Sequence, residues 1–142
     1  MTAKEYLKQA YRLNQRVNSK LEMLETLKQL ATKCTSTVSG MPSGSKQSTS
    51  TMADTIEKIV DMKGEIDTEI NRLVKLIREI TNVIKLVKNP EHQMLLERRY
   101  VCFCSWEQIA VDMNYSIQHT FRIHGRAMKE IEKILKDESK CD

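Results

Sequence analysis

The chain has 142 residues, of which 40% are hydrophobic and 30% charged, and it holds only four Gly, two Pro and seven aromatic residues. A chain of this length forms one domain or two small ones, and its many Leu, Ile, Lys and Glu residues predict an all-α fold. No apolar run approaches the roughly 18 residues that a membrane-spanning helix needs, and the first residues lack the apolar stretch of a signal peptide. We therefore expect a cytoplasmic protein without membrane contact.

The net charge of +4 is unevenly distributed along the chain. Residues 1–89 hold 15 Lys and Arg against 10 Asp and Glu, a balance of +5, whereas residues 90–142 hold eight against nine, a balance of −1. The second region can still bind nucleic acid if its cations gather on one face.

The four cysteines, Cys34, Cys102, Cys104 and Cys141, are scattered, and only the middle two lie close together. A zinc site usually shows two paired ligand clusters at a set spacing. We therefore expect reduced thiols, and neither a metal ion nor another cofactor.

The first predicted element is a coiled-coil helix in residues 1–33. Thr2 and Glu5 have the spacing of a capping box, so a helix can begin there. Apolar residues then recur in steps of three and four, which is the heptad pattern of a coiled coil, and Lys20 interrupts it. The pattern comprises Ala3, Tyr6, Ala10, Leu13, Val17, Leu24, Leu27 and Ala31.

Residues 34–51 consist almost entirely of Ser, Thr and Gly, with Pro42 among them. Such a composition buries too little apolar surface to order itself. We predict a flexible linker that is long enough to let the chain reverse direction.

A second long coiled-coil helix is predicted in residues 52–89, running from about Met52 to Lys88. Thr51 and Asp54 have capping spacing, and Asn89 followed by Pro90 ends the helix. One polar residue, Lys63, interrupts its seam. The seam comprises Met52, Ile56, Ile59, Lys63, Ile66, Ile70, Leu73, Ile77, Ile80, Ile84 and Val87.

Two seams on either side of a linker predict an antiparallel helical hairpin, whose register the sequence leaves open. The second helix also carries apolar flanks, among them Val60 and Val74, which one partner helix does not cover. A second copy of the chain can cover them, so we expect a homo-oligomer formed through the coiled coil. The alternative is that these residues form only the core of one hairpin.

Residues 90–142 change character and predict three shorter helices. Pro90 suits a first helical position, with Asn89 as its cap. Ser105, with Gln108 three residues later, predicts the start of a second helix. Asn114 tolerates the left-handed conformation, and Ser116 can cap a third helix that reaches about Lys136.

These three helices fit a helix-turn-helix, in which two helices cross over a short turn. Ala110 supplies the small residue where the helices cross, and Asn114 supplies the turn. Thr120 and Ile123 then face inwards after the turn. The inner stripe continues with Ala127, Ile131 and Ile134.

The polar residues outside that stripe are the candidates for binding double-stranded DNA, because the first half of a recognition helix enters the major groove. Gln and Arg suit bidentate contacts with base edges, while Ser at a helix start and Lys suit phosphates. The candidates are Ser105, Ser116, Gln118, His119, Arg122, Arg126 and Lys129, with Arg98 and Arg99 as further phosphate contacts. The alternative for each is a solvated surface side chain. We expect Trp106 and Phe121 to belong to the core.

The same stretch resembles region four of bacterial sigma factors. That region has a Ser-x-x-x-Ile-Ala pattern, a turn, a capping Ser and an Arg-Ala-Leu in its last helix, and the counterparts are Ser105, Ile109-Ala110, Ser116 and Arg126-Ala127-Met128. This stretch more closely resembles small phage proteins of Gram-positive hosts with a sigma-like C-terminus, including the ArpU and RinA type of late-gene regulators. The resemblance covers roughly 45 residues strongly. It implies promoter DNA as a partner, RNA polymerase as a second possible partner, a bacterial host cell, and an activator.

Two other classes remain as alternatives. A coiled-coil assembly protein, or a small DNA-packaging subunit of a phage terminase, also combines an oligomerising helical part with a helix-turn-helix. An enzyme is not expected, because the sequence has no nucleotide-binding loop and no paired acids in an apolar frame. His92, His119 and His124 lack evident partners for acid–base chemistry.

Overall fold

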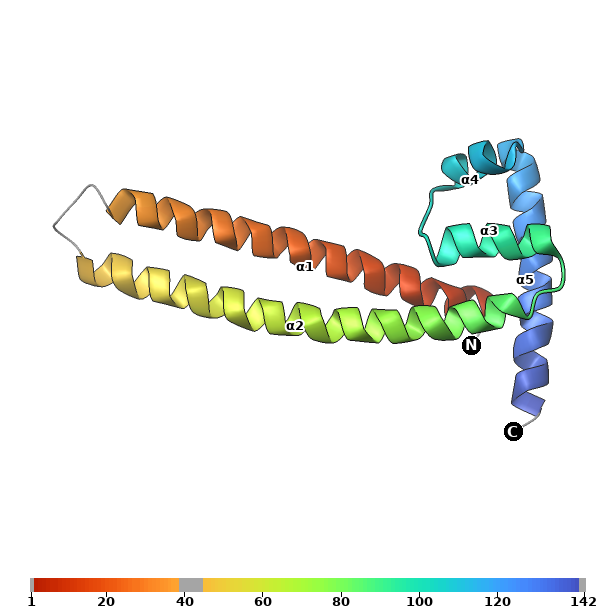
Figure 1. The fold of residues 1–142 in the computed structure, drawn as a ribbon, viewed down its shortest axis with the longest axis horizontal. Coiled ribbons are helices and arrows are strands. Elements are labelled where there is room, and N and C mark those ends of the chain that lie inside the picture. Colours follow the sequence, from red (N-terminus) through yellow and green to blue (C-terminus); the bar gives the residue numbers. More distant parts are fainter. Residues whose placement is uncertain (1, 39–44, 141–142) are drawn as a thin grey trace. The chain divides into compact units, whose positions relative to one another are not determined.

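The computed structural model describes residues 2–38 and 45–140, with side chains described outside 34–51. The described residues form five helices and no strand, so the predicted all-α fold is confirmed (Figure 1). The helices are α1 (Ala3–Val38), α2 (Ser45–Lys85), α3 (Pro90–Tyr100), α4 (Trp106–Met113) and α5 (Ile117–Lys140).

Both long helices extend into the region predicted to be a linker. Helix α1 continues to Val38 and α2 already begins at Ser45, so only residues 39–44 of that prediction lie outside the described residues. The capping box predicted at Thr51 is therefore wrong, because Thr51 lies inside α2. Ser and Thr cost a helix only some tenths of a kcal/mol each, and an established helix extends more readily than a new one starts.

The other ends of the long helices follow local rules. At the start of α1, the Thr2 amide donates to Glu5 Oε2 and the Glu5 amide donates to Thr2 Oγ1, each at 3.2 Å, which is the predicted capping box. Helix α2 ends at Lys85, three residues before the predicted end. The amides of Leu86 and Val87 then bond to carbonyls three residues earlier, which tightens the final turn.

The chain divides into two compact units. Residues 14–72 form the hairpin unit, and residues 1–13 together with 73–142 form the head unit. The sequence had suggested a boundary between residues 89 and 90. The first turns of α1 and the last turns of α2 instead belong with α3, α4 and α5.

In the hairpin unit the predicted seam is correct on α1 and partly wrong on α2. Val17 and Leu24 of α1 are buried, as is Ile66 of α2. Three residues predicted to lie in the α2 seam, Ile56, Lys63 and Ile70, are exposed, and at the last two of them the neighbouring residue replaces the predicted one. The residues one position earlier take those places, and they are the half-buried Met62 and the buried Glu69. Since apolar residues flank the seam on both sides, their spacing alone left the rotation of α2 open.

An ion pair joins α1 and α2 in this rotation. Lys20 Nζ of α1 lies 3.0 Å from Glu69 Oε1 and 3.6 Å from a carboxylate oxygen of Glu65, and Arg16 lies 3.9 Å from Glu69. Lys20, the predicted polar break in the α1 seam, thus pairs with Glu69 of α2. Lys63, the predicted polar break in the α2 seam, is exposed. A buried charge left without its partner is costly, so the pair selects one alignment of the two helices.

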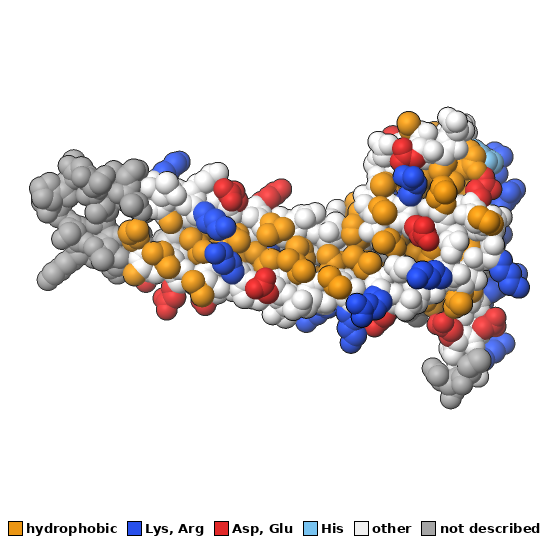
Figure 2. All heavy atoms as spheres, viewed as in Figure 1, with side chains coloured by type: hydrophobic (Ala, Val, Ile, Leu, Met, Phe, Trp, Pro, Cys, Tyr) orange, Lys and Arg blue, Asp and Glu red, His pale blue; other side chains and the backbone are white. Residues whose placement is uncertain are grey.

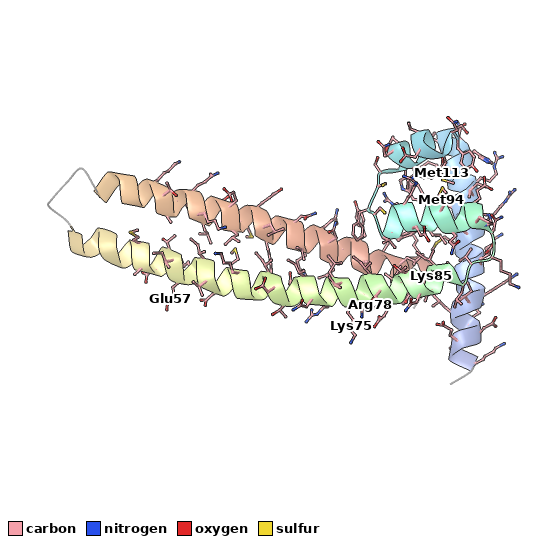
Figure 3. All side chains as sticks on the ribbon, in the orientation of Figure 1. Glu57, Lys75, Arg78, Lys85, Met94 and Met113 are labelled. Carbon is pink, nitrogen blue, oxygen red and sulfur yellow. The ribbon has the colours of Figure 1, made fainter. Side chains whose placement is uncertain are left out.

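The head unit has two buried regions. One contains residues from the first turns of α1, the last turns of α2, and α3 and α5, and its fully buried members include Leu7, Ile80, Ile84, Leu96 and Ile131. The other joins α3, α4 and α5 through Leu95, Ile109 and Ile123, with Cys104, Trp106, Met113 and Tyr115 packed against them. Met113 lies between α4 and α3 (Figure 3). This second core holds the predicted helix-turn-helix together.

Candidate nucleic-acid interface

Helix α4 begins and ends as its sequence predicts. Ser105 Oγ accepts a hydrogen bond from the Gln108 amide at 3.2 Å. At the other end Asn114 adopts the left-handed conformation, with φ of 61° and ψ of 40°, and the Tyr115 amide bonds to the Ala110 carbonyl at 2.9 Å. Asn is one of the few non-glycine residues that adopt this conformation readily. The chain therefore turns sharply from α4 into α5.

The start of α5 also matches the prediction. Ser116 Oγ accepts from the His119 amide at 3.1 Å. Thr120 is completely buried, and its hydroxyl donates to the Ser116 carbonyl at 2.9 Å, which removes the cost of placing a polar group in the core. Ile123 and Ala127 are buried next along the same face. The inner stripe of the predicted recognition helix is therefore confirmed.

The outer face of α5 carries the basic candidates. Its exposed polar side chains recur at helical spacing and are Gln118, Arg122, Arg126 and Lys129. In the described part of the chain none of these three cations is in an ion pair. Residues 117–129 contain no acid, whereas four acids accompany three lysines in 130–140. In Figure 2 basic side chains follow the edge that α5 forms.

Three cations of residues 90–142 gather on one face of α5, as nucleic-acid binding requires of a region without net positive charge. The region 90–142 has a balance of −1 as a whole, yet the first half of α5 carries +3. The helix dipole adds partial positive charge at the same end. A local cationic face thus exists where a recognition helix meets DNA.

His119 differs from the other candidates because its ring is half-buried. It lies edge-on against Tyr115, with ring centroids 4.5 Å apart and planes at 87°. Its side chain therefore packs over the turn between α4 and α5.

The two arginines predicted as further phosphate contacts are used inside the module. Arg98 donates to Asp112 at 2.8 Å. Arg99 donates to the Cys104 carbonyl at 3.0 Å, and its guanidinium lies 4.5 Å from the Trp106 ring centroid. Arg99 therefore orients the connection between α3 and α4, and its contact with phosphate stays a prediction.

Two histidines join α3 to α5. His92 Nδ1 lies 2.6 Å from Glu130 Oε1, and His124 Nε2 lies 2.7 Å from the Tyr100 hydroxyl. Burial, with smaller contributions from Arg99 and nearby lysines, lowers the pKa of His124 from 6.5 to about 4. His124 is therefore neutral at pH 7.

Apolar side chains also reach the surface of this module. Phe121, predicted to be core, is 49% exposed, and its ring meets the Trp106 ring at a steep angle with a centroid distance of 5.2 Å. Val111 on α4 is 72% exposed. Spacing along the chain does not indicate this exposure, since apolar residues flank the inner stripes of both helices.

Other kinds of site find little support in the described residues. Cys102 and Cys104 are free thiols, and no group of three or more potential metal ligands occurs in the described part. Among the helices described, none is both long and apolar enough to cross a membrane.

The chain belongs to a family described as proteins of unknown function, DUF1492, whose model matches residues 35–132. The match covers the end of α1, all of α2 to α4 and the first two thirds of α5. Neither a curated protein nor a solved structure matches the chain.

Proposed function

We propose that the chain is a sequence-specific DNA-binding protein that acts as a transcriptional regulator, an activator of phage or prophage genes with a sigma region-four-like helix-turn-helix. The observation that carries the proposal is the acid-free first half of α5, which presents unpaired cations directly after a sharp turn. A helix in this position is the one that enters the major groove in helix-turn-helix proteins.

Each exposed residue of this face has a role that suits its chemistry. Gln118 and Arg122 lie in the first two turns of α5, where side chains reach base edges, and their side chains form paired hydrogen bonds with adenine and guanine. Arg126 and Lys129 lie farther along and meet the phosphate backbone. Ser105 and Ser116, at the starts of α4 and α5, place amides and hydroxyls against phosphates.

The test is a fluorescence anisotropy titration with promoter fragments from the same genome and with random duplex, at two salt concentrations. Arg122→Ala should cost about 1–3 kcal/mol on the specific fragment and relax the preference at one base pair. Lys129→Ala should weaken both duplexes equally and reduce the salt slope by about one.

Lys140→Ala is the matched control, because Lys140 is exposed at the far end of α5, outside the acid-free half. It should leave the affinity for both duplexes nearly unchanged. If Arg122→Ala binds both duplexes as the parent chain does, α5 is not the recognition helix.

A second candidate function is docking on a protein such as RNA polymerase through the same module. The exposed apolar Val111 and Phe121 favour it, because isolated DNA contacts do not require such side chains while protein interfaces are rich in them. Val111→Ser would weaken capture of purified RNA polymerase and leave DNA affinity unchanged if this function exists. Equal capture of RNA polymerase by Val111→Ser and by the parent chain would exclude it.

A further inference from the structure

Helix α2 carries a second apolar stripe, separate from the seam that packs against α1. The stripe recurs in steps of three and four, and all its members but the half-buried Ile77 are exposed. It comprises Ala53, Ile56, Val60, Lys63, Asp67, Ile70, Val74 and Ile77. Val60 is 62% exposed and Ile70 is 36% exposed. Apolar side chains along the helix appear in orange in Figure 2.

The order of residues in this stripe is nearly the same when read from either end. Apolar residues occupy both ends, and one cation and one acid, Lys63 and Asp67, occupy the centre. A second copy laid antiparallel on the stripe brings Val60 opposite Ile70 of that copy, and Lys63 opposite Asp67. The same register brings Ile56 opposite Val74, so a single alignment satisfies every pair.

We propose that two copies of the chain associate through this stripe of α2 as an antiparallel, twofold-symmetric dimer whose axis passes close to residue 65. Twofold interfaces are self-complementary, so that each contact occurs twice. The paired stripes are about 36 Å long at 1.5 Å per residue.

Charge selects the antiparallel arrangement. In a parallel pair each residue lies opposite itself, which places Lys63 against Lys63 and Asp67 against Asp67. Like charges facing each other destabilise a coiled coil, and polar residues at seam positions specify orientation. In the antiparallel register both central contacts are between opposite charges.

Gly64 lies close to the proposed axis. It lies in the interior of α2, where Gly costs a helix about 0.5–1 kcal/mol relative to Ala. A Cβ added there would meet nothing within 4 Å, so packing within one chain does not require a glycine. In the proposed register Gly64 of each copy lies one residue from the axis, at the edge of the stripe, so it places no side chain beside the partner helix.

The proposal is independent of the proposed function, because its test uses no DNA. Sedimentation of the full chain over a range of concentrations should show a reversible dimer. Val60→Glu should raise the dissociation constant about tenfold or more, since the charge enters the apolar interface at two symmetric places. Met23→Glu is the control, because Met23 is equally apolar and exposed but lies on α1, outside the stripe. It should leave the dissociation constant unchanged.

Exchange of the central charges tests the orientation. Lys63→Asp and Asp67→Lys should each weaken the dimer, because each brings like charges together twice, and the double variant should restore it. Circular dichroism of each variant checks that the helices persist. The proposal would be overturned by a chain that stays monomeric, by a ring of many copies or by a dimer that Val60→Glu leaves intact. It would also be overturned if the double variant dimerises no more tightly than the single variants.

Discussion

The two units of the chain use apolar residues in different ways. In the head unit three helices surround Leu95, Ile109 and Ile123, so that these side chains are almost completely buried. In the hairpin unit only two helices meet, and side chains such as Val60 and Ile70 remain at the surface. Two helices cover one stripe of each other, while three enclose a core. The comparison teaches that three helices enclose the apolar residues at the centre of the head unit, whereas two helices leave an apolar stripe of α2 exposed in the hairpin.

The largest expected effect comes from opening the head core. Ile123→Ala removes most of a buried side chain and should lower the free energy of unfolding by about 2–5 kcal/mol. Ile56→Ala, on the exposed stripe of the hairpin, should change it by less than about 0.5 kcal/mol in the monomer. Urea denaturation at a low protein concentration measures both. Equal losses would mean that the two units do not differ in the way described.

A smaller effect is expected from the ion pair inside the hairpin. Lys20→Ala leaves the buried carboxylate of Glu69 with only Arg16 at 3.9 Å, and should cost about 1–3 kcal/mol, between the values for exposed and buried pairs. The double variant Lys20→Leu with Glu69→Leu should recover most of that loss, because no charge stays buried. A double-mutant cycle, measured by urea denaturation, gives the interaction free energy between Lys20 and Glu69. A value near zero would show that the pair does not stabilise the register.

The turn in the head unit should respond to substitution by about 1 kcal/mol. Asn114→Ala keeps the Cβ but removes the side-chain carboxamide that lets Asn adopt the left-handed conformation readily. This conformation costs ordinary residues about 1–2 kcal/mol. Asn114→Gly should be close to neutral, since Gly adopts positive φ freely. Thermal unfolding of the two variants compares them. Equal melting temperatures would contradict the role given to the turn.

The last prediction concerns the pH dependence of the head unit. His124 has a pKa of about 4 when folded and 6.5 as its ordinary value, so the unfolded chain takes up a proton first as the pH falls. The contribution of His124 to stability is therefore full above pH 6.5 and is lost progressively as the pH falls towards 4. His124→Gln should reduce the slope of the free energy of unfolding against pH over this window. The reduction corresponds to at most one proton taken up on unfolding.

His119→Gln serves as the control in the same pH series, because it removes a histidine of the same helix that packs against Tyr115 and not against Tyr100 and Trp106. It should leave the slope between pH 6.5 and 4 closer to that of the parent chain than His124→Gln does. If the two variants have the same slope, burial of His124 does not govern this dependence.

The sequence by itself determined the local features of this protein. The starts of α3, α4 and α5, the left-handed residue at Asn114 and the inner stripe of α5 all follow from rules that act within a few residues. A capping side chain needs only its own neighbours, and helical spacing determines which residues share a face. For the same reason the all-α fold followed from composition and periodicity.

Only the tertiary structure decided how the helices are rotated about their axes and which charged side chains contact other residues. Apolar residues on both sides of the α2 seam allowed two rotations, and the contact of Lys20 with Glu69 selected one. Arg99 and Arg122 look alike in the sequence, yet one lies against Trp106 and the other is exposed. Such outcomes depend on residues that are distant along the chain, and local spacing carries no information about which of them meet.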